Sequence, residues 1–268
     1  MQKGIAVAIC AAGSDAPTQL LPDQGWSRTK ALEWLLGEMP ADTLVGLDLG
    51  PSLPFVDRGA FFPGWEESPA DARGLWGLIE RLCADDPHLA ASSFVDHPEA
   101  ARHFRRHGGR KGEFFEGRGR LRVTEEAQRV QGLNPYSNFN LVGASQVGKS
   151  SLTGMRVLHR LQGQLPIWPF DASLRGSLVV EIYTSIAALA AGRPRGRTKM
   201  RTVAELNAAL LALGSATIAG DGAIDDHSSD AILTAAWLRT VADRPNLWRP
   251  DGLTPHIART EGWTFGVT

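Results

Sequence analysis

The sequence has few cysteines and no long apolar run. Its 268 residues include only Cys10 and Cys83, which cannot form a disulfide scaffold and lack the spacing of metal ligands. No stretch approaches the roughly 20 apolar residues that a membrane-spanning helix needs. Lys3 before the apolar residues 5–12 loosely imitates a signal peptide, but that run is short. We therefore expect a first strand there, and a cytoplasmic protein without a membrane partner.

The sequence also lacks an excess of charge of either sign. Its 28 basic and 29 acidic residues leave a net charge of −1, which argues against a uniformly basic nucleic-acid binder. Hydrophobic residues make up 43% of the chain and charged residues 21%, a composition that is able to bury a core. The length suits one generous α/β domain or two small ones.

Strand and helix patterns alternate along the chain, which is typical of α/β architecture. Short β-rich runs predict strands at 4–10, 18–21, 43–49, 167–170, 178–183 and 261–267. Amphipathic patterns predict helices at 28–39, 69–84, 150–161, 203–213 and 226–242. We expect a single α/β domain over residues 1–268, with residues from about 50 to 135 forming an insertion or lobe.

A glycine-rich stretch at 143–150 has the pattern of a phosphate-binding loop. In such a loop, backbone N–H groups hold phosphates, the lysine (here Lys149) reaches the terminal phosphates, and the serine (here Ser150) binds Mg²⁺. The apolar run before it, 139–142, is short for a buried central strand. Two interpretations stay open: the nucleotide site of an ATPase or kinase, or a turn into a helix with Lys149 in solvent or touching an anion.

Several carboxylates lie in apolar contexts, where an unpaired buried charge is costly. Asp48 ends one predicted strand and Glu181 interrupts another, while Asp226 and Asp230 are four residues apart and share a helix face. Together they offer the oxygen ligands that suit Mg²⁺ or Mn²⁺. Each has a structural alternative: a turn for Asp48, an arginine partner for Glu181, and helix capping for Asp225 or Asp226.

Residues 102–122 form a basic island. This segment contains eight basic and two acidic residues, which gives it a net charge of +6. Aromatic residues and glycines are interleaved with them, a composition that suits phosphate contact and base stacking by nucleic acid. A solvated, solubilising loop is the alternative. The candidate substrate-binding residues are Arg105, Arg106, Arg110, Lys111 and, in the glycine-rich stretch, Lys149.

At these residues the chain resembles a family of predicted nucleases with a ribonuclease H-like fold, catalogued as a domain of unknown function. The order and spread of the matching segments cover most of the chain. They are V-G-L-D-L-G-P-S-L-P at 45–54, G-A-S-Q-V-G-K-S-S-L-T-G at 143–154, W-P-F-D at 168–171, V-E-I-Y at 180–183, D-D-H-S-S-D-A-I-L-T-A-A at 225–236 and E-G-W-T-F-G-V at 261–267.

The resemblance implies a ribonuclease H-like mixed sheet flanked by helices. It implies a metal-dependent nuclease that hydrolyses phosphodiester bonds, with Asp48, Glu181, Asp226 and Asp230 as the catalytic, metal-binding carboxylates. It also implies that the glycine-rich stretch belongs to the fold and binds no ATP. Such folds open with a strand that carries an essential Asp. No Asp precedes Asp15, so we expect that strand to be missing here. A non-catalytic nucleic-acid-binding relative is the remaining alternative.

Overall fold

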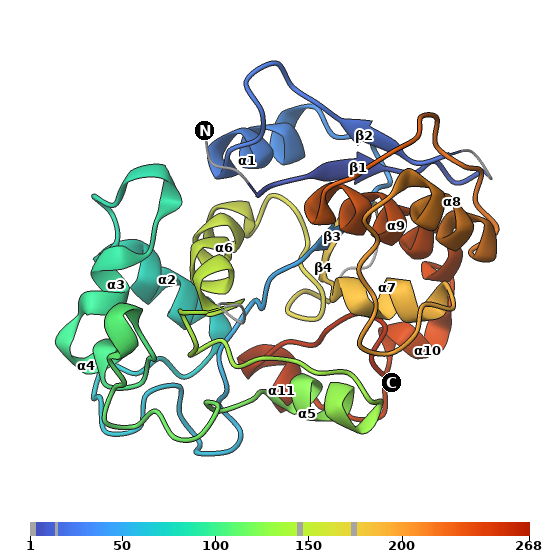
Figure 1. The fold of residues 1–268 in the computed structure, drawn as a ribbon. Helices are drawn as coiled ribbons and strands as arrows, with labels where there is room; N and C mark the ends of the chain where they lie inside the picture. The colour runs from blue at the N-terminus through green and yellow to red at the C-terminus, as the bar shows by residue number, and fades with distance from the viewer. Residues whose placement is uncertain (1–3, 14–15, 144–146, 173–175) are drawn as a thin grey trace. The chain divides into compact units, whose positions relative to one another are not determined.

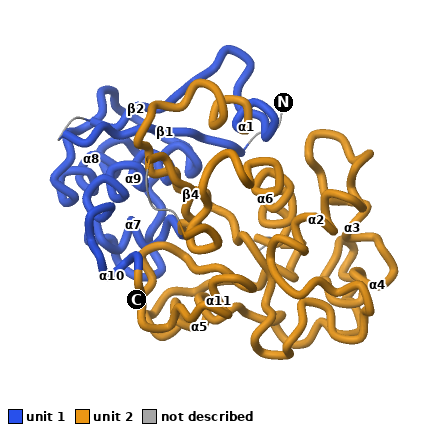
Figure 2. Tube along the Cα trace, turned by 180° about the vertical axis from the view of Figure 1, so that it is seen from behind, with its two compact units in different colours: residues 1–31, 183–248 blue, residues 32–182, 249–268 orange. Residues whose placement is uncertain are grey.

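The structure, a computed structural model, describes residues 4–13, 16–143, 147–172 and 176–268. Within them the chain is a mixed α/β protein, as the sequence predicts, and Figure 1 follows its elements in order. It divides into two compact units (Figure 2): unit 1 contains residues 1–31 and 183–248, and unit 2 contains residues 32–182 and 249–268. No helix in the described part of the chain is both long and apolar enough to span a bilayer.

A helix of 16 residues, α9 (Asp226–Val241), is the centre of unit 1. The strands β1 (Val7–Ile9) and β2 (Thr18–Leu20) form an antiparallel hairpin. α9 packs against β1 and against two shorter helices, α7 (Thr184–Ala190) and α8 (Val203–Ala212). The short helix α10 (Pro245–Trp248) closes the unit.

The centre of unit 2 is a parallel pair of strands, β3 (Leu44–Leu47) and β4 (Leu178–Glu181), in which Leu47 lies opposite Glu181. The other edge of β4 makes two single parallel bridges, from Ile167 to Val179 and from Thr264 to Glu181. β4 is therefore the middle strand of this small platform. All four of its residues are buried, as expected for a parallel strand that is covered on both faces.

The longest helix described in unit 2, α6 (Val147–Leu161), packs against α2 (Ala72–Leu82). Residues of both helices share a hydrophobic cluster with Val179 of β4. Helix α1 has its first residues in unit 1 and the remainder in unit 2. The other helices of the unit are short. The remaining bounds are α1 (Arg28–Gly37), α3 (Ser92–Asp96), α4 (Pro98–Ala101), α5 (Val123–Val130), α11 (Pro255–Thr260), and 3-10 turns at Pro87–Leu89 and His107–Gly109.

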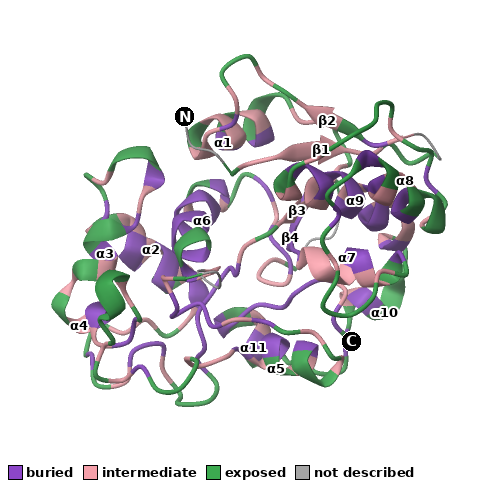
Figure 3. Cartoon of the chain, in the orientation of Figure 1, coloured by how far each residue is buried: buried purple, intermediate pink, exposed green. Residues whose placement is uncertain are grey.

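Residues 50–135, expected to form an insertion or lobe, contribute much of the buried interior of unit 2 (Figure 3). Phe61, Phe62 and Phe94 are completely buried. The ring of Phe62 packs edge-on against Phe94 and Phe139, with centroid distances of 5.7 and 6.1 Å, a geometry that aromatic rings prefer. These residues share one hydrophobic cluster with residues of α6 and β4.

Side-chain caps fix the starts of several helices, and Asp225 is one of the two caps that the sequence predicts. Ser27 Oγ accepts the Lys30 N–H before α1, and Asp225 Oδ1 accepts the Ser228 N–H before α9. Such caps satisfy N–H groups that have no partner within the helix. Two predicted starts shift. Asp71 caps α2, so that helix begins after Pro69, and α6 begins at Val147 instead of residue 150.

Two predicted strands, 167–170 and 261–267, are wrong. Only Ile167 of the first makes a bridge, and Pro169 has no N–H to continue a ladder. In the second, Glu261 closes helix α11, and Gly262 has a φ of +70°, which leaves the extended region. A single bridge at Thr264 remains. Most apolar residues in both segments are buried, but their backbone makes only single bridges and forms no continuous strand.

We expect Gly148→Ala in α6 to destabilise the protein by roughly 2 kcal/mol or more, because overfilling a packed site forces the backbone to move. A Cβ at this position would lie 2.0 Å from the backbone oxygen of Asn138. Gly77→Ala in α2 is the matched control, since its Cβ would meet nothing closer than 3.9 Å and alanine is the better helix former. Urea unfolding measures both. Equal stability of the two variants would contradict the close approach.

Candidate functional site

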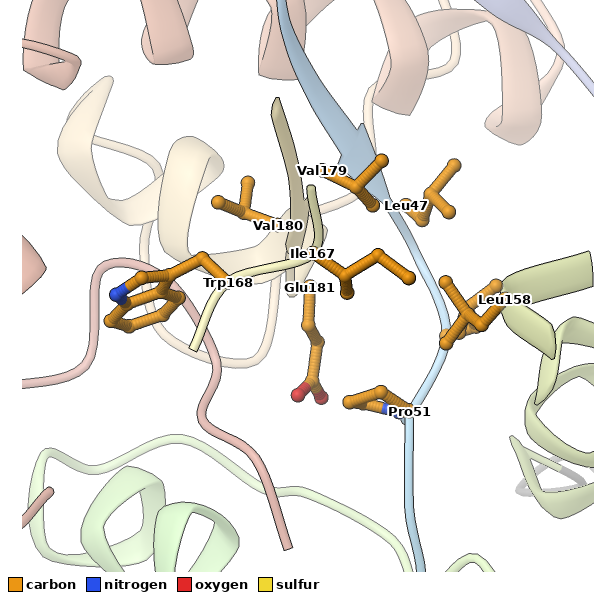
Figure 4. A pocket seen from close by; sticks show the side chains of 9 residues that line it. Leu47, Pro51, Leu158, Ile167, Trp168, Val179, Val180 and Glu181 are labelled. Atoms are coloured by element: carbon orange, nitrogen blue, oxygen red, sulfur yellow. The ribbon is translucent and has the colours of Figure 1, made fainter. Parts of the chain in front are cut away.

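Glu181, at the end of β4, is neutralised by a buried arginine. Both of its carboxylate oxygens accept hydrogen bonds from Arg122, at 2.9 Å from Nη1 and 2.5 Å from Nη2. The side chains are only 1% (Arg122) and 7% (Glu181) exposed. Figure 4 shows the Glu181 side chain at the end of its strand, beside Trp168 and Pro51. The structural alternative for this residue, an arginine partner, is the arrangement found.

Arg122 belongs to a larger buried network that sequence analysis did not find. Its Nε donates to Glu125 Oε1 at 3.0 Å, and its Nη1 donates to the backbone oxygen of Glu261. The Glu261 carboxylate accepts backbone N–H groups, including that of Val123 at 2.6 Å. In the sequence, Arg122 is one of the eight basic residues of the island. No local pattern indicates that it pairs with residues 181 and 261, which are far along the chain.

Burial within this network shifts the pKa values of Glu125 and Arg122. Burial raises the pKa of Glu125 to about 7, although Arg122 opposes the shift. Burial would lower the pKa of Arg122, but Glu125 and Glu181 outweigh it and raise that pKa. Removing one partner of such a buried pair leaves an uncompensated charge, which is strongly destabilising. The network is therefore a structural centre of unit 2.

Asp48 is exposed and lies directly after β3. It occupies a tight turn in which the Leu49 N–H donates to the Leu47 oxygen at 3.0 Å. Leu47 is the residue opposite Glu181, so Asp48 is one position out of register with Glu181. Asp48 lies outside the strand, so the pairing of β3 with β4 does not place its side chain beside Glu181.

Asp226 and Asp230 lie together at the start of α9. The Asp230 side chain is 16% exposed and forms an ion pair with Lys199, whose side chain is 49% exposed. Thr184 Oγ1 lies 3.5 Å from the same carboxylate. Burial raises the pKa of Asp230, and the charge of Asp226 adds to that effect, while Lys199 opposes it. This pair is the part of the predicted acidic set that the structure brings together.

The predicted acids differ in how well they fit a divalent cation. Asp226 and Asp230 are a mutually repelling pair of oxygen ligands, which a cation would stabilise. Glu181 does not fit, because Arg122 already binds both of its oxygens. Among the described residues, no three or more His, Cys, Asp and Glu side chains are arranged to hold a metal ion.

The basic island divides into internal and exposed cations. Arg120 donates to three backbone carbonyls and pairs with Asp57, while Arg102 pairs with Glu99 and Glu113. Arg106 pairs with Asp96. The island residues that are exposed and have no ion pair within the described part of the chain are Arg105, Arg110, Lys111 and Arg118.

Most aromatic residues of the island are buried or covered, and His107 is the exposed one. Phe104 is completely buried and Phe115 is 7% exposed. Phe114 lies under the guanidinium of Arg102, 4.5 Å from ring centroid to Cζ. His103 is buried among these rings, and burial lowers its pKa to about 4, so it is neutral near pH 7. The base-stacking expectation is therefore wrong for His103, Phe104 and Phe115, which are buried.

Residues 144–146 of the glycine-rich stretch lie outside the described residues. Beyond them, Lys149 and Ser150 are exposed in the first turn of α6. The Ser150 hydroxyl donates to the Val147 oxygen at 2.8 Å. The Gly148 N–H donates to the Asn140 oxygen at 3.2 Å, so this N–H is used inside the fold and not directed at a phosphate.

One small apolar pocket lies beside β4 (Figure 4). Its lining includes Leu47, Leu158, Ile167 and Val179, together with Glu181. The volume of about 10 Å³ holds no more than one water molecule. This pocket is too small for a nucleotide or metabolite.

Comparison with known proteins gives no match: no protein-family model matches the chain, and neither a curated protein nor a solved structure is significantly similar to it.

We expect Glu125 to lower the unfolding free energy as the pH rises from about 4.5 to 7, against an opposite contribution from His103, whose folded pKa of about 4 lies below its ordinary value of 6.5. Its folded pKa of about 7 lies above the ordinary value of 4.5. The folded state therefore holds a proton that the unfolded state releases, and the stabilisation is lost as the pH rises through the folded pKa. Glu125→Gln stays neutral and keeps the His103 contribution, so its unfolding free energy will increase relative to that of the wild type as the pH rises.

Urea unfolding at pH 5 and pH 8 measures this difference. Glu126→Gln is the control, because Glu126 is its exposed neighbour in α5. The same pH dependence in Glu125→Gln and the control would show that Glu125 holds no extra proton.

Proposed function

We propose that this protein is a nuclease-like protein of ribonuclease H-like fold that acts on the phosphodiester backbone of nucleic acid with Mg²⁺ or Mn²⁺. The order of elements supports the proposal. An antiparallel hairpin comes first, a parallel strand pair follows, and a late helix carries two acids. The sequence segments that resemble the predicted nuclease family include β3, β4 and the start of α9.

The observation that carries the proposal is the acidic pair at the start of α9. Asp226 is the first residue of the helix, and Asp225, not Asp226, is the cap. Asp230 lies one turn further on and is largely buried, so neither capping nor the helix dipole explains its position. Its countercharge is a lysine whose side chain is half exposed. Because the Lys199 side chain is half exposed, it would be able to move away from Asp230 without disturbing the hydrophobic core.

Asp226 and Asp230 would hold the divalent cation. When bound, such a cation supplies an activated water and stabilises negative charge on phosphate. Lys199 neutralises Asp230 when no cation is there, so the lysine and the cation would compete for this carboxylate. Thr184 Oγ1 fixes the position of the Asp230 carboxylate. Unit 2 has a separate surface, on which Lys149 and the exposed cations Arg105, Arg110 and Lys111 would bind the nucleic-acid backbone.

A second candidate is a non-catalytic nucleic-acid-binding relative of the same fold. The observation that favours it is the ion pair between Glu181 and Arg122. A carboxylate that ends a central strand is a natural metal ligand, and here it is committed to an arginine. In this candidate the exposed cations bind nucleic acid and the acids only stabilise the fold.

The nucleotide-binding alternative, an ATPase or kinase that uses Lys149 and Ser150, has less support. A phosphate-binding loop needs its backbone N–H groups for the phosphates, and the Gly148 N–H is bonded to Asn140.

We expect Asp230→Asn and Asp226→Asn each to reduce Mn²⁺-dependent cleavage of mixed DNA and RNA substrates at least tenfold, because each removes one charged metal ligand. Asp225→Asn is the matched control. It makes the same chemical change one residue away, and asparagine still caps the helix. Asp48→Asn is measured in parallel.

Full activity of Asp230→Asn would rule out the acidic pair as the centre. Binding of labelled nucleic acid by the wild type, with no cleavage in Mn²⁺ or Mg²⁺, would favour the second candidate.

We expect Arg122→Met to lose about 3–5 kcal/mol of unfolding free energy, because it leaves Glu181 buried without a partner. Arg122→Met/Glu181→Met will recover part of that loss, since an apolar pair of similar volume needs no charge compensation. Urea unfolding measures both, with and without Mn²⁺. If Mn²⁺ restores the single variant but not the double variant, Glu181 is able to bind metal and the ion pair is not its only role.

A further inference from the structure

The four basic residues 105, 106, 110 and 111 form the two arms of a small β-hairpin, over residues 104–112. The Arg106 N–H donates to the Arg110 oxygen at 2.8 Å, and the Gly112 N–H donates to the Phe104 oxygen at 2.9 Å. Two glycines at the tip, Gly108 and Gly109, have φ values of +72° and +74°, a conformation that glycine adopts without steric cost. The sequence places these cations in a loop, whereas the structure places them on a defined scaffold.

The hairpin is fixed to the body of unit 2. The Arg105 N–H donates to the Phe139 oxygen, and the Leu141 N–H donates to the Arg105 oxygen, each at 3.0 Å. The 104–106 arm is therefore the middle of three short segments. The same 139–141 segment accepts the Gly148 N–H through Asn140. The exposed Lys149 follows in α6, so the hairpin and Lys149 are anchored to one piece of backbone.

Arg105 and Lys111 lie directly opposite each other across the hairpin. The hydrogen bonds on either side of them identify a non-hydrogen-bonded pair, the kind in which opposite side chains come closest. Like charges at such a position destabilise a hairpin. Both residues are exposed, and no acidic side chain in the described part of the chain forms an ion pair with either. Stability of the fold therefore gives no reason for this pair.

The neighbouring acids are already committed. Asp96 pairs with Arg106, and Glu113 pairs with Arg102. Arg110 is exposed at the tip, and its Nε reaches only the His107 oxygen, at 3.3 Å. The hairpin thus presents Arg105, Arg110 and Lys111 to solvent as unneutralised cations. This arrangement fits a partner that brings several negative charges at regular spacing.

The partner's chemistry follows from what lies beside these cations. The adjacent rings of Phe104, Phe115 and Phe139 are buried, and Phe114 is covered by Arg102. Proteins that bind single strands use exposed aromatic side chains on which bases stack. The one exposed ring of residues 104–112 is the imidazole of His107 at the tip. Exposed cations outnumber it, which favours the phosphates of a duplex, whose bases are already stacked.

We propose that the hairpin at 104–112 is a docking surface for the phosphate backbone of duplex nucleic acid, and that it binds without reading bases. The inference deepens the proposed function by naming the form of the nucleic acid, and it rests on that function only for the substrate class. Binding through a few phosphates is independent of base sequence and weakens steeply with salt. Cleavage is not required for it.

The test is the anisotropy of a short fluorescent DNA duplex, measured in EDTA so that cleavage cannot occur. We expect affinity to fall roughly a hundredfold between about 50 and 200 mM salt, as for about four phosphate contacts. Arg105→Glu will weaken binding about tenfold or more and make the salt dependence shallower by about one phosphate contact. The same substitution will not lower the melting temperature, because it converts a like-charge pair into an opposite-charge pair.

Arg249→Glu is the matched control. It makes the same charge change at an exposed residue of unit 2 and should leave the affinity within about twofold of the wild type. Lys149→Ala is expected to weaken binding in the same direction as Arg105→Glu.

Three results would overturn the proposal: equal loss of affinity in Arg105→Glu and Arg249→Glu, a large fall in melting temperature for Arg105→Glu, or tighter binding of a single strand than of the duplex. Because the acidic pair is intact in these variants, a failure here is distinct from a failure of metal-dependent cleavage.

Discussion

The buried guanidinium of Arg122 is the constraint on which unit 2 depends. It joins the end of β4 through Glu181, the first turn of α5 through Glu125, and the residue after α11 through the Glu261 backbone. Glu181 and Glu261 are far from Arg122 in the sequence, so these two bonds close long loops, whereas Glu125 is a local partner three residues away. Charges buried together stabilise a fold only if all of them find partners. The Glu261 carboxylate meets that condition by accepting N–H groups from residues 55, 56 and 123.

The sequence predicts well those elements whose signals are local. The start of α9 follows from Asp225 and the hydrophobic pattern after it, and β3 and β4 follow from short apolar runs between turn residues. It fails where the cause lies elsewhere in the chain. The run at 261–267 alternates like a strand, but it is divided by the end of α11 and by the positive φ of Gly262.

The same distinction applies to the candidate site. The four-residue spacing of Asp226 and Asp230 is a local signal, and the structure places them together as that spacing predicts. The partner of Glu181 is a long-range fact: nothing within the V-E-I-Y segment identifies Arg122. The island's net charge also hides a division that composition cannot show, because Arg120 and Arg122 serve the interior while Arg105 and Lys111 face solvent.

The register of β3 and β4 has a consequence for how such a site arises. Leu47, not Asp48, lies opposite Glu181. A carboxylate one residue earlier would stand on the same face of the strand pair as Glu181 and compete with it for Arg122. In the present arrangement Glu181 is the only acid at the paired strand ends and is bound by Arg122. Moving one acid by one position along β3 would place two acids there. To build a metal centre on this strand pair, a designer would place an acid at position 47 and replace Arg122, so that the Glu181 carboxylate becomes available. The strands themselves would not have to move.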